Sequence, residues 1–329
     1  MTVPFFFRLL FFIFLFFLAP ATLYICCWLL GKVAGIFIPK AVRLGRKVGL
    51  ALALTLVACF LFGLTVGWRL LRVRNVTLQV EGLPAAFDGY RIAHLSDWHI
   101  GSFAGHGGLV EKTVRKVLEA EPDVILFTGD LENRIPSEVE PFVPLLSRLS
   151  APDGVWSVLG NHDYGTYQHD QSPEILDSLV TRLKQLKAEM GWNLLLNSHT
   201  VITRGTDSLA ILGVENEGEP PFPELADIPK ALEGLPDGMF KILLTHDPAH
   251  WRKAVLPDTD IQLTLSGHTH AWQFRIGPFS PAMFFFKEWA GAFEEDGQVL
   301  FVNTGLGGFL NFRFGAWPEV DVLTLRAKK

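Results

Sequence analysis

Five short polar patches in this 329-residue sequence combine carboxylate, amide and imidazole side chains that could bind a metal ion or transfer a proton. In chain order they are Ser96-Asp97-Trp98-His99, Gly129-Asp130, Gly160-Asn161-His162-Asp163, Thr245-His246 and Gly267-His268-Thr269-His270. A single Asp-x-His or His-x-His is usually a surface or capping feature, so no patch is decisive alone. Five patches in one chain instead predict one shared site.

The donor atoms in these patches are oxygens and imidazole nitrogens, without a thiolate. The seven predicted metal ligands are Asp97, His99, Asp130, Asn161, His246, His268 and His270. Such donors suit Mn, Fe, Zn or similar divalent ions rather than a structural zinc, and Asp130 could bridge two ions through its two carboxylate oxygens. Two ions about 3.5–4 Å apart can hold a hydroxide and clamp the oxygens of an in-line phosphoryl displacement. The patches therefore predict a two-metal site for phosphoryl chemistry.

Each patch follows a short apolar run that is typical of a buried strand. These runs are residues 90–95, 123–127, 154–159, 240–244 and 261–265. An α/β sheet exposes its site at the carboxyl ends of its strands, where several loops converge. The five predicted strands therefore explain how ligands far apart in the sequence could meet.

The rest of the chain from residue 75 alternates strand-like runs with helical ones. Further strands are predicted at residues 75–80, 200–203, 209–214, 299–303 and 320–325, and helices at 108–120, 138–149 and 173–190. Early strand–helix alternation followed by a strand-richer second half predicts a layered α/β domain over residues 75–329.

The N-terminal part is apolar enough to contain two membrane-spanning helices. Leu9–Gly31 and Gly49–Trp68 carry no charge, and roughly 20 apolar residues suffice to cross the hydrocarbon core. The alternatives are a signal peptide cleaved at Ala19-Pro20-Ala21 for the first run and a buried core helix for the second. Residues 1–74 are thus predicted to anchor the chain in the cell (inner) membrane as an integral membrane protein.

Charged residues predict an orientation and argue against one class of partner. The predicted loop between the spans, Lys32–Val48, carries five cations, against four on the outer flanks. Cations favour the cytoplasmic side, which predicts an extracytoplasmic α/β domain. The net charge of −5 argues against a general nucleic-acid binder. All three cysteines precede residue 60, so the α/β part has neither a disulfide framework nor a thiolate metal site.

Taken together, the five patches resemble the signature of the calcineurin-like metallophosphoesterase superfamily, in the right order and over nearly all of residues 75–329. Within it, the chain is similar to the YkuE-like branch of membrane-associated bacterial phosphohydrolases. The residues behind this second resemblance are Glu81-Gly82-Leu83-Pro84, Gly89-Tyr90-Arg91-Ile92 and Val302-Asn303-Thr304-Gly305-Leu306-Gly307.

The resemblance implies a four-layer αββα sandwich and a division of the ligands between two ions. One ion would be held by Asp97, His99, Asp130 and His270, and the other by Asp130, Asn161, His246 and His268. His162 would protonate the leaving group or stabilise its charge, and Asp163 would orient the imidazole, in agreement with the use of histidine as a general acid. Gly160 would allow the turn before them.

Two further residues and two segments have a predicted place or role. The family usually has a smaller residue at Trp98, which we expect to pack beside the site, and His94 is expected in the core. Two insertions could choose the substrate: Glu215–Gly238, which is acidic and proline-rich, and the apolar Gly277–Gly291. The second is expected to be a core strand or a packed lid. The alternative is a flap that dips into a membrane or binds acyl chains.

The sequence thus predicts a membrane-anchored, metal-dependent phosphoric ester hydrolase that cleaves a phosphoester or pyrophosphate bond. The first hypothesis for its substrate is a lipid-linked phosphate. The alternatives are a tethered phosphoesterase for soluble nucleotides or phosphoproteins, and a membrane scaffold that binds metal without turnover. A complete ligand set together with His162 argues against the scaffold.

Overall fold

The computed structural model describes residues 10, 12–168, 171–218, 220, 222–308 and 310–328. Residues 9 and 11, at the start of the first predicted span, lie outside the described residues. The chain divides into two compact units, Met1–Trp68 and Arg69–Lys329. Each unit is a separate structural body.

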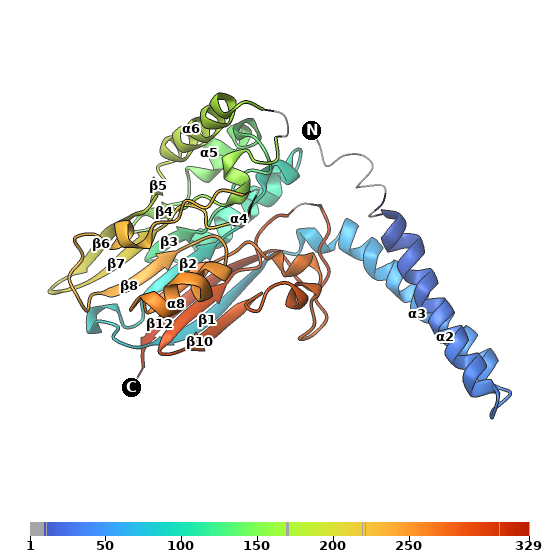
Figure 1. Ribbon diagram of the computed structural model, residues 1–329. Helices are drawn as coiled ribbons and strands as arrows, with labels where there is room; N and C mark the ends of the chain where they lie inside the picture. Colours follow the sequence, from blue (N-terminus) through green and yellow to red (C-terminus); the bar gives the residue numbers. More distant parts are fainter. Residues whose placement is uncertain are drawn as a thin grey trace. The chain divides into compact units, whose positions relative to one another are not determined.

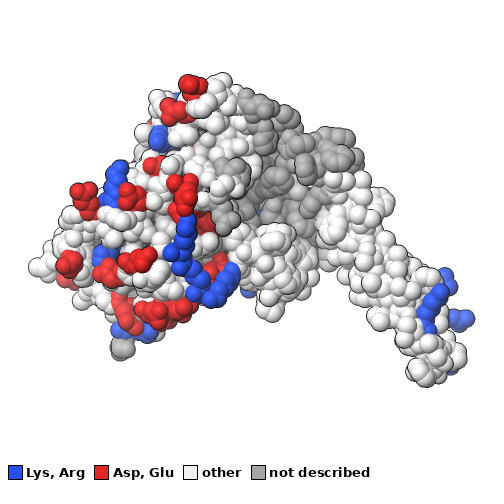
Figure 2. Space-filling model, in the orientation of Figure 1, with Lys and Arg blue, Asp and Glu red and all other residues white. Residues whose placement is uncertain are grey.

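The first unit is a helical hairpin. Its elements are η1 (Phe14–Leu18), α2 (Ala19–Gly35), α3 (Ala41–Thr65) and η2 (Gly67–Arg69). Two stretches, Phe14–Gly35 and Ala41–Arg69, are long and apolar enough to cross a membrane. The expected loop Lys32–Val48 is mostly helical, because α3 begins well before the charge-free run. Lys and Arg side chains gather at the connecting end of the hairpin on the face shown in Figure 2.

Glycines let the two helices of the hairpin approach closely. A Cβ atom at Gly31 would lie 2.9 Å from the Ala41 carbonyl oxygen and 3.1 Å from the Gly45 Cα atom. Gly31-x-x-x-Gly35 on α2 and Gly45-x-x-x-Gly49 on α3 are the spacings that allow close helix packing in membranes. The hairpin is therefore packed backbone to backbone.

The second unit contains two six-stranded mixed sheets. The first has the order β1-β12-β2-β3-β4-β5, with β1 (Arg72–Val80), β2 (Arg91–Leu95), β3 (Val124–Phe127), β4 (Val155–Ser157), β5 (Asn193–Leu194) and β12 (Glu319–Ala327). The second has the order β10-β11-β9-β8-β7-β6, with β6 (Ser198–Arg204), β7 (Asp207–Gly213), β8 (Phe240–Leu244), β9 (Leu263–Ser266), β10 (Gly291–Glu295) and β11 (Gln298–Val302). Strands β2, β3 and β4 are parallel, and so are β7, β8 and β9.

The main core lies between the two sheets. Alternating residues of β7 show this arrangement, because successive side chains of a strand point to opposite faces. Leu209 and Ile211 belong to the cluster between the sheets, whereas Ala210 and Leu212 belong to a second cluster on the outer face. The α7 helix (Ile228–Leu232) and the π-helical turn η8 (Trp251–Val255) pack in that outer cluster.

Helices cover the outer face of the first sheet as well. They are α4 (Gly107–Glu119), α5 (Val143–Leu146) and α6 (Pro173–Glu189), which lie together on one side of β3, β4 and β5 (Figure 1). In α4, Val110, Val114 and Val117 are buried at helical spacing. The four-layer αββα architecture is thus confirmed.

Two local predictions were wrong, and two strands were missed. The helix expected at residues 138–149 is broken into short pieces, because Pro141 and Pro144 lack an N–H donor and fit only the first turn of a helix. Strands β5 and β10 were not predicted. The segment Gly277–Gly291 is neither a core strand nor a packed lid, since it forms the 3₁₀ turn η10 (Pro281–Phe284) with exposed aromatic side chains.

Candidate metal centre

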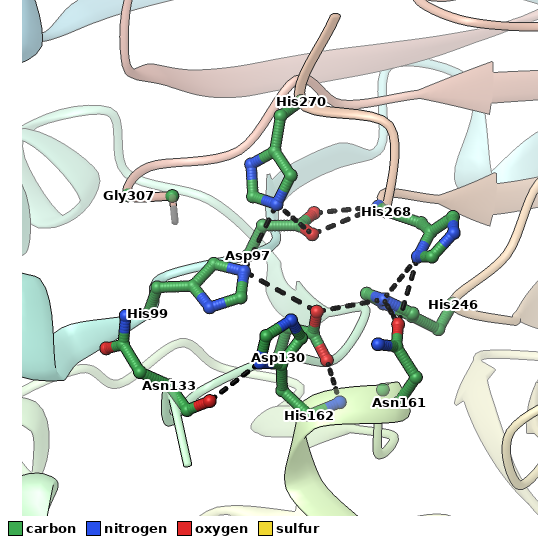
Figure 3. Close-up of polar contacts among 12 residues, drawn as sticks. Asp97, His99, Asp130, Asn133, Asn161, His162, His246, His268, His270 and Gly307 are labelled. Atoms are coloured by element: carbon green, nitrogen blue, oxygen red, sulfur yellow. Dashed lines mark hydrogen bonds and ion pairs between the residues drawn. The ribbon is translucent and has the colours of Figure 1, made fainter. Parts of the chain in front are cut away.

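All seven predicted ligands lie just beyond the carboxyl ends of parallel strands. They are Asp97 and His99 after β2, Asp130 after β3, Asn161 after β4, His246 after β8, and His268 and His270 after β9. The first sheet supplies four of these side chains and the second sheet three, and all seven converge on one place (Figure 3).

Five of the seven ligands have a positive φ angle. The values are 49° for Asp97, 45° for His99, 58° for Asp130, 69° for His268 and 51° for His270. Each such conformation costs about 1–3 kcal/mol and persists only where the surroundings over-determine it. Bonds between the ligand loops do so here: the Asp97 N–H donates to the Gly129 carbonyl (2.9 Å) and the His99 N–H to the Asp130 carbonyl (3.1 Å).

Four ligands form a first cluster of donor atoms. The Nε2 atoms of His99 and His270 are 3.1 Å apart. Asp97 Oδ1 lies 3.3 Å from His270 Nε2, and Asp130 Oδ2 lies 3.5 Å from His99 Nε2. One carboxylate oxygen of each aspartate therefore faces an imidazole nitrogen.

A second cluster shares an atom with the first. Asp130 Oδ2 also lies 3.2 Å from His246 Nε2. Asn161 Oδ1 is 3.1 Å from His246 Nε2 and 3.0 Å from His268 Nδ1, and these two nitrogens are 3.3 Å apart. Asp130 Oδ2 is thus common to both clusters.

This spacing fits two divalent ions. Donor atoms that lie about 2.0–2.2 Å from one ion lie roughly 3.0–3.5 Å from their neighbours on that ion, and the distances within both clusters have these values. The Nε2 atoms of His99 and His270 also face each other, and both can donate a lone pair to the same cation. Oxygen and imidazole donors without sulfur favour Mn, Fe or Zn.

Burial and neighbouring charges set the protonation of the ligand side chains. Burial lowers the pKa of His99 and of His270 well below the ordinary value, so both are neutral. Burial alone would raise the pKa of Asp130, but His246 and His162 outweigh it and the pKa falls well below the ordinary value. Burial opposes protonation of His246, but Asp130 outweighs it and raises the pKa of His246 to about 10. A bound cation would replace that proton, because a ligating histidine is neutral.

Outer contacts hold the rings of two ligands. His246 Nδ1–H donates to the Thr128 carbonyl at 2.7 Å, which leaves Nε2 for an ion. His268 presents Nδ1 to the cluster, and its Nε2 lies 3.8 Å from the Asp247 carboxylate. Such contacts fix the tautomer and the orientation of a ligand. Sequence reasoning missed both partners, although Asp247 directly follows His246.

Three contacts hold the His162 ring beside the first cluster. Nδ1–H donates to the Asn133 carbonyl at 2.6 Å. The ring stacks on Tyr167 with centroids 4.0 Å apart, and it meets the His99 ring edge to face at 4.5 Å. Since Nδ1 is already bonded, Nε2 is the atom of His162 that can exchange a proton with a substrate.

Asp163 does not orient this imidazole, contrary to the expectation. Its carboxylate accepts four backbone N–H bonds at 2.9–3.3 Å, from Asp130, Leu131, Glu132 and Gly160. Asp163 therefore ties the loop after β4 to the loop after β3. A main-chain carbonyl, that of Asn133, holds the imidazole instead, and no pattern of side-chain types could have indicated it.

Two glycines of the patches are required because there is no room for a side chain at their positions. Gly160 has an extended backbone (φ −104°, ψ 178°), so it is not needed for a left-handed turn. A Cβ atom there would overlap the Asp130 carboxylate, and one at Gly267 would overlap the Ser96 hydroxyl and the Asp97 carboxylate. These glycines let the backbone approach the ligands.

The two remaining predictions for this region hold. Trp98 is fully buried and packs beside the site. His94 is a core residue, with Nε2 2.9 Å from the Thr128 hydroxyl, and burial lowers its pKa to about 3.

Two other neighbours of the ligands were missed. The Tyr167 hydroxyl accepts a hydrogen bond from Asn161 Nδ2 at 3.2 Å. The buried Arg313 donates to the Thr304 carbonyl at 2.9 Å, and its Nη2 atom lies 3.5 Å from His270 Nδ1. Neither residue belongs to a patch, so the sequence carries no signal for them.

Comparison with known proteins agrees with this geometry. Residues 90–272 match the calcineurin-like phosphoesterase family. The uncharacterized metallophosphoesterase YkuE of Bacillus subtilis is 30% identical over 76% of this chain and 84% of its own. A transmembrane protein with metallophosphoesterase domain from Danio rerio is 33% identical over 85% of this chain and 63% of its own.

A third relative has a named substrate. The UDP-2,3-diacylglucosamine pyrophosphatase LpxG of Chlamydia trachomatis is 27% identical over 77% of this chain and 89% of its own. The family match covers more than half of this chain, including the strands that deliver the ligands. The chain therefore belongs to the calcineurin-like metallophosphoesterases and is a hydrolase of that family.

Proposed function

We propose that this chain is a membrane-anchored phosphoesterase that uses two divalent ions to hydrolyse a phosphoester or pyrophosphate bond of a lipid-linked phosphate. The observation that carries the hydrolytic part is the pair of donor clusters sharing Asp130 Oδ2, with His162 held beside the first. Two divalent ions in these clusters would supply water activation and neutralise charge on the phosphoryl oxygens.

Seven side chains of the site would bind the ions, and one would transfer a proton. Asp97, His99 and His270 would hold one ion, and Asn161, His246 and His268 the other, with Asp130 serving both. His162 would protonate the leaving oxygen from Nε2, since its Nδ1–H is bonded to the Asn133 carbonyl. The ring is clamped between Tyr167 and His99, so it delivers the proton from a fixed position.

Three observations favour a lipid-linked substrate. The chain carries two helices long and apolar enough to cross a membrane. The related LpxG protein is named as a pyrophosphatase for a diacylated glucosamine nucleotide. In the second unit, the Phe286 ring meets the ring of the ligand His268 edge to face, with centroids 5.6 Å apart. An apolar side chain therefore borders the metal centre.

The same proposal includes an orientation. The connecting end of the hairpin carries five cations, namely Lys32, Lys40, Arg43, Arg46 and Lys47. The outer flanks carry four, and cations favour the cytoplasmic side of a cell membrane, so this excess supports an extracytoplasmic catalytic unit. A topology reporter fused after Lys329 tests this assignment, and cytoplasmic reporter activity would reject it.

Hydrolysis of a chromogenic phosphodiester by the full-length protein with Mn²⁺ tests the reaction class. Asp130→Asn removes the shared ligand charge and is expected to abolish Mn-stimulated turnover. His162→Asn is expected to lower kcat by about 10²–10⁴-fold, and less for a good leaving group that needs no proton. Asp258→Asn makes the same change at an exposed carboxylate and should be neutral. Absence of turnover in the wild type would favour a metal-binding scaffold.

A paired substrate measurement tests the lipid part. The values of kcat/KM are compared for a diacylated pyrophosphate in mixed micelles and for its soluble headgroup analogue. We expect the diacylated substrate to have the higher value. Equal values, or a preference for soluble nucleotides or phosphoproteins, would replace the lipid-linked substrate by the tethered alternative.

A further inference from the structure

An exposed apolar surface adjoins the metal centre, and hydrolysis of a phosphoester does not by itself require it. We call it the apolar platform; its six side chains are Trp272, Ile276, Phe279, Met283, Phe284 and Phe285. Their exposed fractions run from 43% for Phe279 to 73% for Phe284. Four of the six are aromatic, and an aromatic side chain has on the order of 150–250 Å² to bury, so the platform presents on the order of several hundred Å² of apolar surface to water. An exposed area of that size marks an interaction surface.

Ring contacts and a β-bridge join several of these side chains. The rings of Trp272 and Phe285 stack with centroids 4.3 Å apart, and those of Phe279 and Phe284 meet edge to face at 6.2 Å. Ile276 and Phe279 are joined by two backbone hydrogen bonds, of 2.9 and 3.0 Å. Met283 lies beside Phe284 in η10. The exposure is therefore not that of scattered surface residues.

Strained backbone carries Trp272, one of the six platform residues. Ala271, Trp272 and Gln273 have φ angles of 47°, 49° and 56°, and such a run persists only where other contacts hold it. The Gln273 side chain donates to the carbonyls of Leu310 and Phe312, and the Ser280 hydroxyl donates to the Ala271 carbonyl at 2.7 Å. These bonds fix the turn that carries Trp272 and link it to Ser280 at the start of η10.

The platform and the metal centre share their backbone. The ligand His270 lies two residues before Trp272, in the same left-handed turn. Phe286, which follows the platform residue Phe285, contacts the ligand His268. Whatever binds the platform is thus held next to two of the three ligands from the second sheet, His268 and His270.

The charges within this segment favour an anionic surface. Arg275 lies between the platform residues Trp272 and Ile276, and Lys287 follows Phe285 by two residues. The only carboxylate in residues 270–288 is Glu288. Glu288 is buried and accepts from Arg252 Nε at 2.6 Å, so it does not face a partner. Exposed aromatic residues with adjacent cations are typical of segments that lie in the interface of an anionic membrane.

The chain itself brings a bilayer within reach. The second candidate span ends at Arg69, and β1 begins at Arg72. Only Leu70 and Leu71 lie between them, so the catalytic unit is tethered directly to any membrane that the hairpin crosses.

We infer that the apolar platform inserts into the boundary between headgroups and acyl chains of a phospholipid bilayer. Insertion holds the metal centre at the height of the lipid phosphates, so that a lipid-linked substrate is reached from the membrane plane. The inference of insertion is drawn from the exposed surface and does not depend on the reaction. The use of insertion in catalysis rests on the proposed function. The proposed occupant of the platform is a bilayer. The competing occupants are the acyl chain of a single bound substrate and a second copy of the chain.

Depth-dependent quenching in nanodiscs that hold one protein copy each tests the insertion. Cys26, Cys27 and Cys59 are replaced by alanine in the full-length chain, and Phe284→Cys carries a nitrobenzoxadiazole label. The bilayer contains phosphatidylcholine and phosphatidylglycerol. Ile175→Cys, on the exposed face of α6 and 46% exposed, is the matched control.

The label at residue 284 is expected to be quenched by nitroxide lipids and shielded from aqueous iodide, and the label at residue 175 to behave oppositely. Equal access of iodide to both labels would overturn the inference. Shielding that requires added diacyl substrate would identify an acyl-chain site instead. Shielding found only in crowded proteoliposomes, and absent from single-copy nanodiscs, would identify a second copy. Either result rejects bilayer insertion.

Activity in the same nanodiscs tests the consequence for catalysis. The double variant Phe284→Ser/Phe285→Ser is expected to lose about tenfold or more in kcat/KM for a bilayer lipid pyrophosphate, because buried aromatic area drives interfacial binding. Its kcat/KM for a soluble diester should remain unchanged, as should both values for Ile175→Ser/Val201→Ser, at two exposed apolar positions away from the site. Equal loss on both substrates would refute the role of the platform. A wild-type protein that is inactive on both substrates would reject the proposed function. The quenching measurement would still decide whether the platform inserts into the bilayer.

Discussion

Replacing Asp163 by asparagine separates two roles that this carboxylate could have, orienting His162 or holding backbone. Its Oδ1 atom accepts N–H bonds from Leu131 (2.9 Å) and Glu132 (3.3 Å), and Oδ2 accepts from Asp130 (3.0 Å) and Gly160 (3.1 Å). An asparagine side chain retains one acceptor oxygen and presents an NH₂ group in place of the other. One pair of buried N–H groups therefore loses its acceptor.

The expected loss of stability follows from the number of N–H groups left without an acceptor. A buried N–H group left unpaired costs about 1–3 kcal/mol, so two cost roughly 2–6 kcal/mol. This is a large part of the about 5–15 kcal/mol by which a domain is stable. Burial raises the pKa of Asp163, which shows that its charge is itself costly to bury. The neutral asparagine avoids part of the cost of burying that charge. We therefore expect a loss of stability in the lower half of the interval of roughly 2–6 kcal/mol and a fall in Tm of roughly 4–12 °C.

Thermal unfolding of the full-length chain with EDTA measures this loss without metal binding. Asp177→Asn makes the same change at an exposed position of α6 and should leave Tm unchanged. At a temperature where the Asp163→Asn variant is folded, kcat with saturating Mn²⁺ should stay within about tenfold of the wild type. An unchanged Tm with kcat lowered by about 10²–10⁴-fold, the size of a lost general acid, would refute the reasoning.

Three further predictions concern other parts of the chain. Tyr167→Phe keeps the ring on His162 but removes the acceptor for Asn161 Nδ2; Mn²⁺ titration should show affinity about tenfold weaker and an unchanged kcat at saturation. Burial lowers the pKa of His94 to about 3, below the unfolded value of about 6.5, so the unfolded chain binds the proton first and stability falls as pH falls. The unfolding free energy should drop by about 2 kcal/mol from this residue between pH 7 and 5, and a curve for His94→Gln parallel to the wild type would contradict this. Gly45→Leu should push α2 and α3 apart at their glycine contact, which spin-label distances across the hairpin would reveal.

Much of the fold was predictable because its signals are local. Apolar runs of four to six residues marked the strands that carry ligands, and the helical spacing of Val110, Val114 and Val117 marked α4. The two-residue strand β5 and the edge strand β10 carry no such signal. The helix expected at residues 138–149 failed because its two prolines interrupt the hydrogen-bond ladder despite a favourable apolar pattern.

The prediction for the apolar segment Gly277–Gly291 failed for a different reason. Hydrophobic residues are usually buried, so a run of phenylalanines suggests a core element. Here Phe284 and Phe285 lie in solvent, at 73% and 66% exposure, although they are part of such a run. Whether a run of this kind is buried depends on tertiary contacts, which its composition does not contain.

By itself, the sequence determined which side chains could donate to a metal, because donor type is a property of each residue and each patch directly follows a strand. Only the tertiary structure decided how the donors are held. It placed Asp130 Oδ2 in both clusters, gave the orientation of His162 to the Asn133 carbonyl, and turned Asp163 toward four amides. These partners are main-chain groups from other loops, and every residue has such groups. Which of them meets a given side chain is therefore set by the packing of the two sheets and not by residue type.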